Sequence, residues 1–126
     1  MIPLLSRNIK HLLYAFRHSF WGLSAAFRSE RAFRIEIFLS IFFIPLAFLI
    51  GDSIFEHLIL LGSWFFVLLM ELVNTAIETI VNRISRDHHP DSGKAKDIGS
   101  AIVFIASIQA VFVWGAIGIL WLSKLK

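Results

Sequence analysis

Cysteine is absent from this chain of 126 residues, and proline, tyrosine and methionine are rare, with three, one and two copies. Without cysteine, the chain cannot form disulfides, thiolate nucleophiles or cysteine-ligated metal sites. The motifs that commonly hold nucleotides or catalytic zinc, GxxxxGK[ST], GxGxxG and HExxH, are also missing. Any nucleotide or metal site must therefore be built in another way.

Apolar side chains, by contrast, make up 57% of the sequence, and the mean hydropathy is +0.75. This composition is too apolar for a small soluble domain and is typical of a compact membrane protein. The length leaves room for one domain of a few helices, residues 1–126, and none for a separate nucleotide-binding fold. Basic residues interrupt the apolar character of the first residues, so we do not expect a signal peptide there.

Three apolar segments are expected to cross the membrane as helices, at about residues 32–51, 55–84 and 97–122. The first is short for a span, which usually needs about 20 apolar residues, and Pro45 is expected to kink its middle. The second is longer than a hydrocarbon core ~30 Å thick requires, so its end at Arg83 should project into the headgroups. The third is uncharged beyond its first residue and is the clearest span.

Residues 5–28 form an amphipathic pattern ahead of these spans. Apolar side chains recur at helical spacing, with basic and histidine side chains between them. A basic, aromatic-rich helix of this kind lies in the membrane interface rather than across it. A packing helix of the soluble type is the less favoured interpretation. The expected fold is therefore an all-α membrane protein with one surface helix and three transmembrane helices.

The distribution of basic residues predicts the topology. Lysine and arginine gather before the first span and between the second and third, whereas the Asp52–His57 connection has none. By the positive-inside rule, the N-terminus and the Ser85–Asp97 loop are expected to be cytosolic. Lys124 and Lys126, near the C-terminus, weakly oppose this orientation.

The most informative residues lie inside the second span. Glu71, Asn74 and Glu78 are spaced by three and four residues, which places them on one helical face with Thr75 beside them. A charge at the centre of a bilayer costs roughly 2.5–3.5 kcal/mol on insertion scales. The two carboxylates must therefore face protein, a water-filled cleft or a cation rather than lipid. This stripe predicts a functional site.

Further charged residues belong at the same cytosolic boundary. Glu30 precedes the first span, and Asp97 begins the third with Lys96 beside it. Mg²⁺ prefers a few carboxylates together with substrate phosphates, and phosphoryl transfer needs positioning, charge neutralisation and a base. Glu71 suits the base, at a depth that a lipid hydroxyl can reach. These residues fit a kinase that uses ATP and a membrane lipid.

Two other interpretations stay open at this stage. The acids could belong to a small channel or proton-relay subunit, or could only join helices by hydrogen bonds. A relay needs acids at successive depths, but the second span is purely apolar above Glu71. Joining helices would not require Glu30, Lys96 and Asp97 at the same level. The Asp87–Asp91 run is interpreted as a solvated turn that at most contacts a nucleotide, rather than as a metal site.

The sequence also resembles a known family. The similarity is carried by three motifs, ELVNTAIETIVNRI, SGKAKDIGSA and ERAFRIE, and runs from about Gly22 to Ala106. These motifs resemble those of the small bacterial diacylglycerol kinases and their undecaprenol kinase relatives. The resemblance implies a homotrimer in the bacterial inner membrane, active sites shared between protomers, and Mg²⁺- and ATP-dependent phosphorylation of a lipid alcohol. Diacylglycerol is the expected acceptor and undecaprenol the alternative; no nucleic-acid partner is expected.

The resemblance also implies roles for individual residues. Glu71 would be the catalytic base, with Asn74 in support. Glu30 and Glu78 would hold both the metal and the nucleotide. The other residues that match would contact either the nucleotide (His11, His18, Asp87, His88, His89, Lys96 and Asp97) or the lipid (Arg34, Glu71, Ser100 and Trp114).

This chain departs from the diacylglycerol kinase pattern in a few places. His11 and His18 stand where that family has a basic residue and a tyrosine on the surface helix, and Asn82 replaces the usual aspartate. The SGKAKDIGSA segment and Arg83 favour the diacylglycerol branch over the undecaprenol branch.

Overall fold

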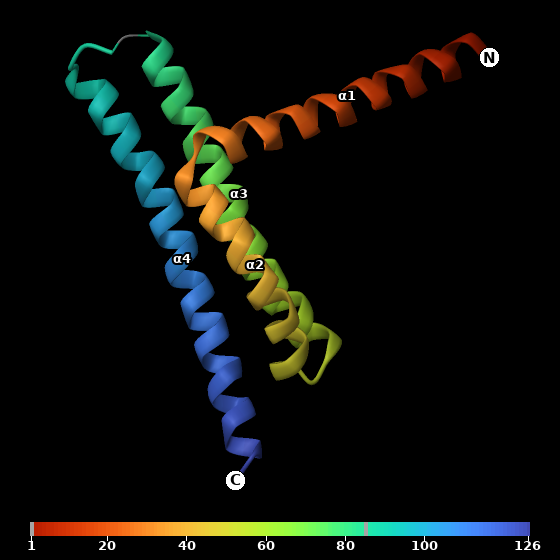
Figure 1. Cartoon of the computed structure of the whole chain (residues 1–126), viewed down its shortest axis with the longest axis vertical. Coiled ribbons are helices and arrows are strands. Elements are labelled where there is room, and N and C mark those ends of the chain that lie inside the picture. Colours follow the sequence, from red (N-terminus) through yellow and green to blue (C-terminus); the bar gives the residue numbers. More distant parts are fainter. Residues whose placement is uncertain (1, 85) are drawn as a thin grey trace.

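The computed structural model describes the backbone of residues 2–84 and 86–126, and the side chains of residues 8–84 and 86–126. Within these residues the chain forms four helices and no strand. The helices are α1 (Ile2–Ser29), α2 (Arg31–Ile50), α3 (Ile54–Ile84) and α4 (Pro90–Lys124) (Figure 1). Of the described helices, α2, α3 and α4 are long and apolar enough to cross a membrane. The prediction of an all-α membrane protein is confirmed.

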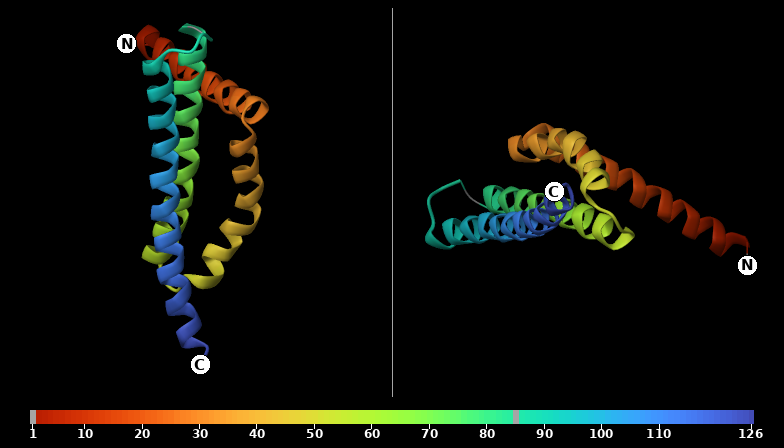
Figure 2. Two further views of the ribbon diagram at one scale, coloured as in Figure 1. Left: turned by 90° about the vertical axis from the view of Figure 1, so that its left-hand side faces the viewer. Right: turned by 90° about the horizontal axis from the view of Figure 1, so that it is seen from below.

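The three apolar helices run side by side, and successive helices point in opposite directions (Figures 1 and 2). α3 and α4 share the most extensive contact, α2 packs mainly on α3, and α2 touches α4 only sparsely. The junction of α1 with α2 lies at the same end of the bundle as the α3–α4 loop, and the α2–α3 connection lies at the other end (Figure 2). Charged residues that precede α2 and α4 therefore come to the same end.

α1 projects away from the other helices over most of its length (Figure 1). Most of its large apolar side chains, among them Leu13, Phe16 and Phe20, are more than half exposed. Such a face, opposite basic residues, suits a helix that lies in the membrane interface. Ala26 near its C-terminus is buried in a cluster with Phe33 and residues of α3.

The break between α1 and α2 falls at Glu30, whose backbone is extended, with φ −101° and ψ 119°. Arg34 on the first turn of α2 donates hydrogen bonds to the backbone carbonyls of Phe27 (3.1 Å) and Arg28 (2.8 Å). The last carbonyls of a helix have no partner within it, and a basic side chain at that end satisfies them. Arg34 thus fixes the sharp turn that places Glu30 at the head of α2.

α4 begins at Pro90, well before the span predicted at residues 97–122. Proline favours the first position of a helix, and the side chain of His89 accepts a hydrogen bond from the backbone N–H of Asp91 (3.2 Å). Hydropathy locates the apolar part of a helix, whereas capping residues decide where the helix starts. The turns of α4 that precede the predicted span are polar and border the α3–α4 loop.

Pro45 lies inside α2 without ending it. In the left view of Figure 2, α2 is bowed, and its second half approaches the other helices. A proline inside a helix removes one backbone hydrogen bond and commonly causes such a bend.

The interior is small and is built around a few close contacts. Ala47 and Leu60 are fully buried where α2 meets α3, and Ala106 is fully buried where α4 meets α3. Small residues let apolar helices approach closely. Trp114 packs against all the buried clusters, whereas many large apolar side chains point outward, as expected for lipid or for neighbouring protomers.

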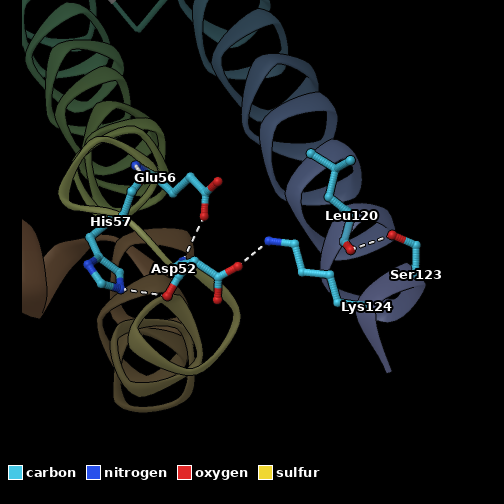
Figure 3. A network of polar contacts seen from close by, with 8 residues as sticks. Asp52, Glu56, His57, Leu120, Ser123 and Lys124 are labelled. Atoms are coloured by element: carbon cyan, nitrogen blue, oxygen red, sulfur yellow. Dashed lines mark hydrogen bonds and ion pairs between the residues drawn. The ribbon is translucent and has the colours of Figure 1, made fainter. Parts of the chain in front are cut away.

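A polar network ties the far end of the bundle together (Figure 3). Lys124 near the end of α4 donates to the carboxylate of Asp52 in the α2–α3 connection. The backbone N–H of Asp52 donates to Glu56 (2.7 Å), and the His57 ring lies 2.9 Å from the Gly51 carbonyl oxygen. Lys124, the residue that opposes the predicted topology, is therefore paired with an acid.

Candidate functional site

The acidic stripe of α3 faces protein. Glu71 is only 6% exposed, and it is one of the few polar residues in the interior. Asn74, Thr75 and Glu78 are half-buried, and Asn82 at the end of the helix is exposed. The side chains of this face become more buried from Asn82, next to the α3–α4 loop, to Glu71, so the Glu71 carboxylate is the most enclosed of them.

Glu71 interacts with acidic side chains of its own helix and of the α2 segment. Glu78 on α3 and Glu30 at the head of α2 repel the Glu71 carboxylate, and Glu36 on α2 interacts with it as well. The end of the bundle at the α3–α4 loop therefore carries a concentration of negative charge. Like charges at close range are unfavourable unless a cation or a proton compensates them. The arrangement is suited to attract a cation.

Asn74 connects the acidic stripe to α4. Its side-chain N–H donates to Glu78 Oε1 (3.2 Å), while its Oδ1 is buried and has no hydrogen-bond partner among the described residues. Gly99 of α4 is buried directly against Oδ1, and a methyl group in its place would collide with that oxygen. A buried carbonyl oxygen without a partner is costly, so Oδ1 is a candidate ligand for a cation or a donor group.

Within the described residues, no three histidine or acidic side chains gather at metal-binding spacing. This does not conflict with Mg²⁺, which keeps several waters and commonly takes only one or two protein carboxylates together with substrate phosphates. Glu30 and Glu78, with the unpartnered Asn74 Oδ1 between α3 and α4, offer oxygen ligands of the required kind. The residues present therefore fit this ion.

A polar pocket of about 430 Å³ lies at the α3–α4 loop. Lys96 reaches into it from α4, and its ammonium group donates to Asn82 Oδ1 on α3 (2.7 Å). The first turns of α4 supply backbone N–H groups and the positive end of a helix dipole, which favour anions. The pocket brings together four of the residues expected to contact a nucleotide, Asp87, His88, His89 and Lys96. It adds Arg86, which the sequence analysis did not single out, and Asn82, Ser92 and Gly93 complete its polar lining.

Other expected site residues lie apart from this pocket within one chain. His11 and His18 are exposed on α1, and His18 packs edge-on against Trp21 at 5.2 Å between ring centroids. Asp97 is exposed on α4 and does not line the pocket. Ser100, expected to contact lipid, is exposed on the same helix.

Arg34 and Trp114, which are both expected to contact lipid, lie in different parts of the structure. Arg34 holds the end of α1, as described above. Trp114 lines an apolar groove of about 410 Å³ between α2 and α4. Glu36 also lines this groove, and its Oε2 is buried without a hydrogen-bond partner in the described part of the chain.

Glu36 is a further residue of the site that the sequence analysis did not single out. Its position inside an apolar helix could have indicated a site, because a charged carboxylate there carries the same free-energy cost of insertion into the membrane as Glu71. Its proximity to Glu71 depends on how α2 packs on α3, which a single sequence does not specify.

Comparisons with known proteins identify the family of this chain. A family model of prokaryotic diacylglycerol kinases matches residues 17–118. The chain is 44% identical over 110 residues to a diacylglycerol kinase of Haemophilus influenzae, covering 87% of this chain and 93% of that protein. It is 40% identical to one of Pseudomonas aeruginosa, over 87% of this chain and 89% of that protein. It is 38% identical to one of Escherichia coli K12, over 82% and 84% respectively. The chain belongs to the prokaryotic diacylglycerol kinase family.

Proposed function

We propose that this protein transfers the γ-phosphoryl group of ATP to the free hydroxyl of diacylglycerol and so makes phosphatidic acid. The observation that carries the proposal is the buried Glu71 carboxylate, which lies among Glu30, Glu36 and Glu78. An apolar groove opens beside these acids, and a polar pocket lies at the same end of the bundle. The membership of the family, and the names of its relatives, support this acceptor.

In the proposed reaction Glu71 acts as the general base. The lipid hydroxyl gives its proton to the Glu71 carboxylate while its oxygen forms a bond to the γ-phosphorus of ATP. The bond from that phosphorus to the bridging oxygen breaks, and ADP leaves. Phosphoryl transfer depends mainly on the positions of the reacting groups and on neutralisation of their charge. The protein would therefore contribute by enclosing the Glu71 carboxylate and by orienting the lipid hydroxyl toward it. Asn74 supports the acids through its hydrogen bond to Glu78.

Glu30 and Glu78 are proposed to hold Mg²⁺, with Asn74 Oδ1 available to the same ion. When bound, the ion neutralises charge on the phosphates that are transferred and released. Both carboxylates are also proposed to belong to the nucleotide site, where they would stand near the phosphates of ATP.

The nucleotide is proposed to occupy the pocket at the α3–α4 loop. Lys96 would neutralise phosphate charge there, with Asp87, His88 and His89 around it and Asp97 one residue further along α4. α1 points away from its own bundle, so we assign His11 and His18 to the nucleotide site of a neighbouring protomer in a homotrimer.

The lipid is proposed to approach from the bilayer along the groove between α2 and α4. Trp114 would contact its hydrocarbon part, Arg34 and Ser100 its polar part, and Glu71 its hydroxyl. The family and the apolar helices establish a bacterial membrane protein. We propose that it lies in the inner membrane with its N-terminus and the α3–α4 loop in the cytosol, where ATP is available.

The decisive experiment compares the purified protein with Glu71→Gln in mixed micelles that contain MgATP and diacylglycerol. The expected loss of kcat is about 10²–10⁴-fold, the usual contribution of a general base, with the oligomeric state unchanged in chemical cross-linking. Glu56→Gln, an acid at the far end of the bundle, is the matched control and should retain the wild-type rate.

Near-normal turnover by Glu71→Gln would show that the base is a different group. Undecaprenol is assayed in parallel, and faster turnover of that alcohol would move the proposal to the sister branch of the family. Proton flux into liposomes without ATP, together with no kinase activity, would favour a proton relay instead.

A further inference from the structure

The groove between α2 and α4 runs along the first half of α2. It begins near Ala32 and Ile35, passes Glu36, and is lined on the α3 side by Trp64 and Val67. At its other end three aromatic rings, one from each apolar helix, meet: Phe43 of α2, Trp64 and Trp114. This set of rings is called the aromatic wall below.

The rings of the aromatic wall are in mutual contact. Phe43 stacks on Trp64, with 4.2 Å between ring centroids and 28° between planes. Trp114 meets Phe43 edge-on at 4.9 Å and 76°. Stacked and edge-on geometries are the favourable ones for aromatic pairs. The wall therefore joins α2, α3 and α4 at one depth, across the line of the groove.

Trp64 is the fixed member of the wall. Its side chain is only 8% exposed, and its indole N–H donates to Ser40 Oγ (2.8 Å). The Ser40 hydroxyl donates in turn to the backbone carbonyl of Glu36 (2.9 Å), one turn earlier on α2. A buried indole that is hydrogen-bonded at its polar end has little freedom to swing aside. The Trp64 ring can therefore move aside for a lipid chain in the groove only if its hydrogen bond to Ser40 breaks.

The position of the wall limits how far a lipid chain can extend. Glu36 and Phe43 are seven residues apart on α2, which corresponds to about 10 Å along the helix. One leaflet of a hydrocarbon core ~30 Å thick is about 15 Å deep. An acyl chain that passes Glu36 in the groove therefore meets the wall about 10 Å further along α2, a distance shorter than the depth of one leaflet.

We propose that one acyl chain of the diacylglycerol substrate occupies this groove, and that Trp64, positioned by Ser40, sets the chain length the enzyme prefers. The inference rests on the lipid-kinase function proposed above. An acyl chain is the expected occupant because the groove runs past Glu36, whose carboxylate interacts electrostatically with that of Glu71, and the lining beyond Glu36 is almost entirely apolar. Trp64 is a positioning residue that does not touch the reacting atoms.

The test measures kcat/KM for dioctanoylglycerol and dioleoylglycerol with the wild type and Trp64→Leu. The substitution opens the end of the groove, so the ratio of long-chain to short-chain kcat/KM should rise by about tenfold or more, the usual discrimination of an apolar pocket. kcat for dioctanoylglycerol is measured in the same assays, so that a general loss of activity is distinguished from a change in chain-length preference. Phe66→Leu is the matched control, because Phe66 lies on the same helix, is 42% exposed and does not line the groove.

Ser40→Ala provides a second variant that leaves the volume of the wall unchanged. It removes the acceptor of the Trp64 hydrogen bond, so the ratio should rise by less than in Trp64→Leu, and the near-ultraviolet circular dichroism of the tryptophans should change. If Trp64→Leu does not fold, this variant and Phe43→Leu carry the test.

Occupancy is measured without turnover, in a protein in which Trp21 and Trp121, which do not line the groove, are replaced by phenylalanine. Diacylglycerol brominated near the end of one chain should quench the fluorescence of Trp64 and Trp114, and unbrominated lipid should not. Unquenched fluorescence would mean that a helix of a neighbouring protomer fills the groove, and would overturn the inference. Equal chain-length ratios in the wild type, Trp64→Leu and Ser40→Ala would also overturn it, whereas a wild type inactive on every diacylglycerol would overturn the proposed function instead.

Discussion

The side-chain oxygen of Asn74 lies so close to the backbone of Gly99 that only a residue without a side chain fits there. Asn74 also donates to Glu78, so this one amide fixes the spacing between α3 and α4 at the level of the acidic side chains. The need for glycine arises from the close approach of two helices, since the backbone conformation of Gly99 is ordinary. Any side chain at residue 99 must displace either Asn74 or α4.

Gly99→Ala is therefore expected to impair catalysis. Displacement of Asn74 would shift Glu78 relative to Glu71, and misplacement by about 1 Å can cost around 10²-fold in rate. Overpacking of this kind also typically destabilises a protein by about 1–3 kcal/mol. The measurements are kcat for diacylglycerol in mixed micelles and the thermal unfolding of the same preparation.

Gly115→Ala is the matched control, since a methyl group on Gly115 in the same helix would meet open space. It should leave both kcat and the unfolding temperature at their wild-type values. Equal rates in the two variants would contradict a role for the Asn74–Gly99 contact in catalysis.

The second prediction concerns the metal requirement of the reaction. Glu30→Gln and Glu78→Gln each remove one negative charge, and the amide introduced by Glu78→Gln retains an oxygen that can accept the hydrogen bond from Asn74. Any defect of Glu78→Gln is thus due to lost charge rather than to a lost hydrogen bond. Each substitution should raise the Mg²⁺ concentration for half-maximal activity by at least about tenfold.

Mg²⁺ titrations at saturating ATP distinguish this role from a structural one. Excess Mg²⁺ should restore much of the rate in these variants but should not restore Glu71→Gln, whose defect lies in proton transfer. A rate that is low and independent of Mg²⁺ in both variants would argue against metal binding by these carboxylates.

The helices and the location of the acidic stripe could be predicted because their signals are local. Long apolar segments imply spanning helices, and a spacing of three and four residues puts Glu71 and Glu78 on one face. α4 begins at Pro90, ahead of the span predicted at residues 97–122, because Pro90 and the cap His89 start the helix before its apolar part.

The aromatic wall and the role of Glu36 could not be predicted in the same way. Phe43, Trp64 and Trp114 come from three helices, and nothing within one helix indicates that their rings meet. Glu36 becomes significant only because α2 packs on α3 at the depth of Glu71. Such relationships depend on the rotation and bend of each helix, which are set by packing rather than by composition.

The third prediction tests the pocket at the α3–α4 loop. Lys96→Gln removes a positive charge from the pocket and should raise the KM for ATP by about tenfold, equivalent to ~1.4 kcal/mol of binding, with a smaller effect on the KM for diacylglycerol. Lys94→Gln is the control, because Lys94 is exposed on the same helix and does not line the pocket. An equal rise in the KM for ATP in both variants would indicate a general effect of surface charge rather than contact with the nucleotide.

The last prediction concerns the opposite end of the bundle, where Lys124 pairs with Asp52. Both side chains are more than half exposed, at 56% and 53%, so water and salt screen the pair and its contribution to stability is small. Lys124→Gln should therefore leave kcat and both KM values unchanged, because the pair lies far along α3 and α4 from Glu71. It should lower the thermal unfolding temperature slightly at low ionic strength, and the difference should vanish in concentrated salt. A loss of activity in this variant at either ionic strength would mean that the α2–α3 connection is coupled to the acidic stripe across the whole length of the bundle.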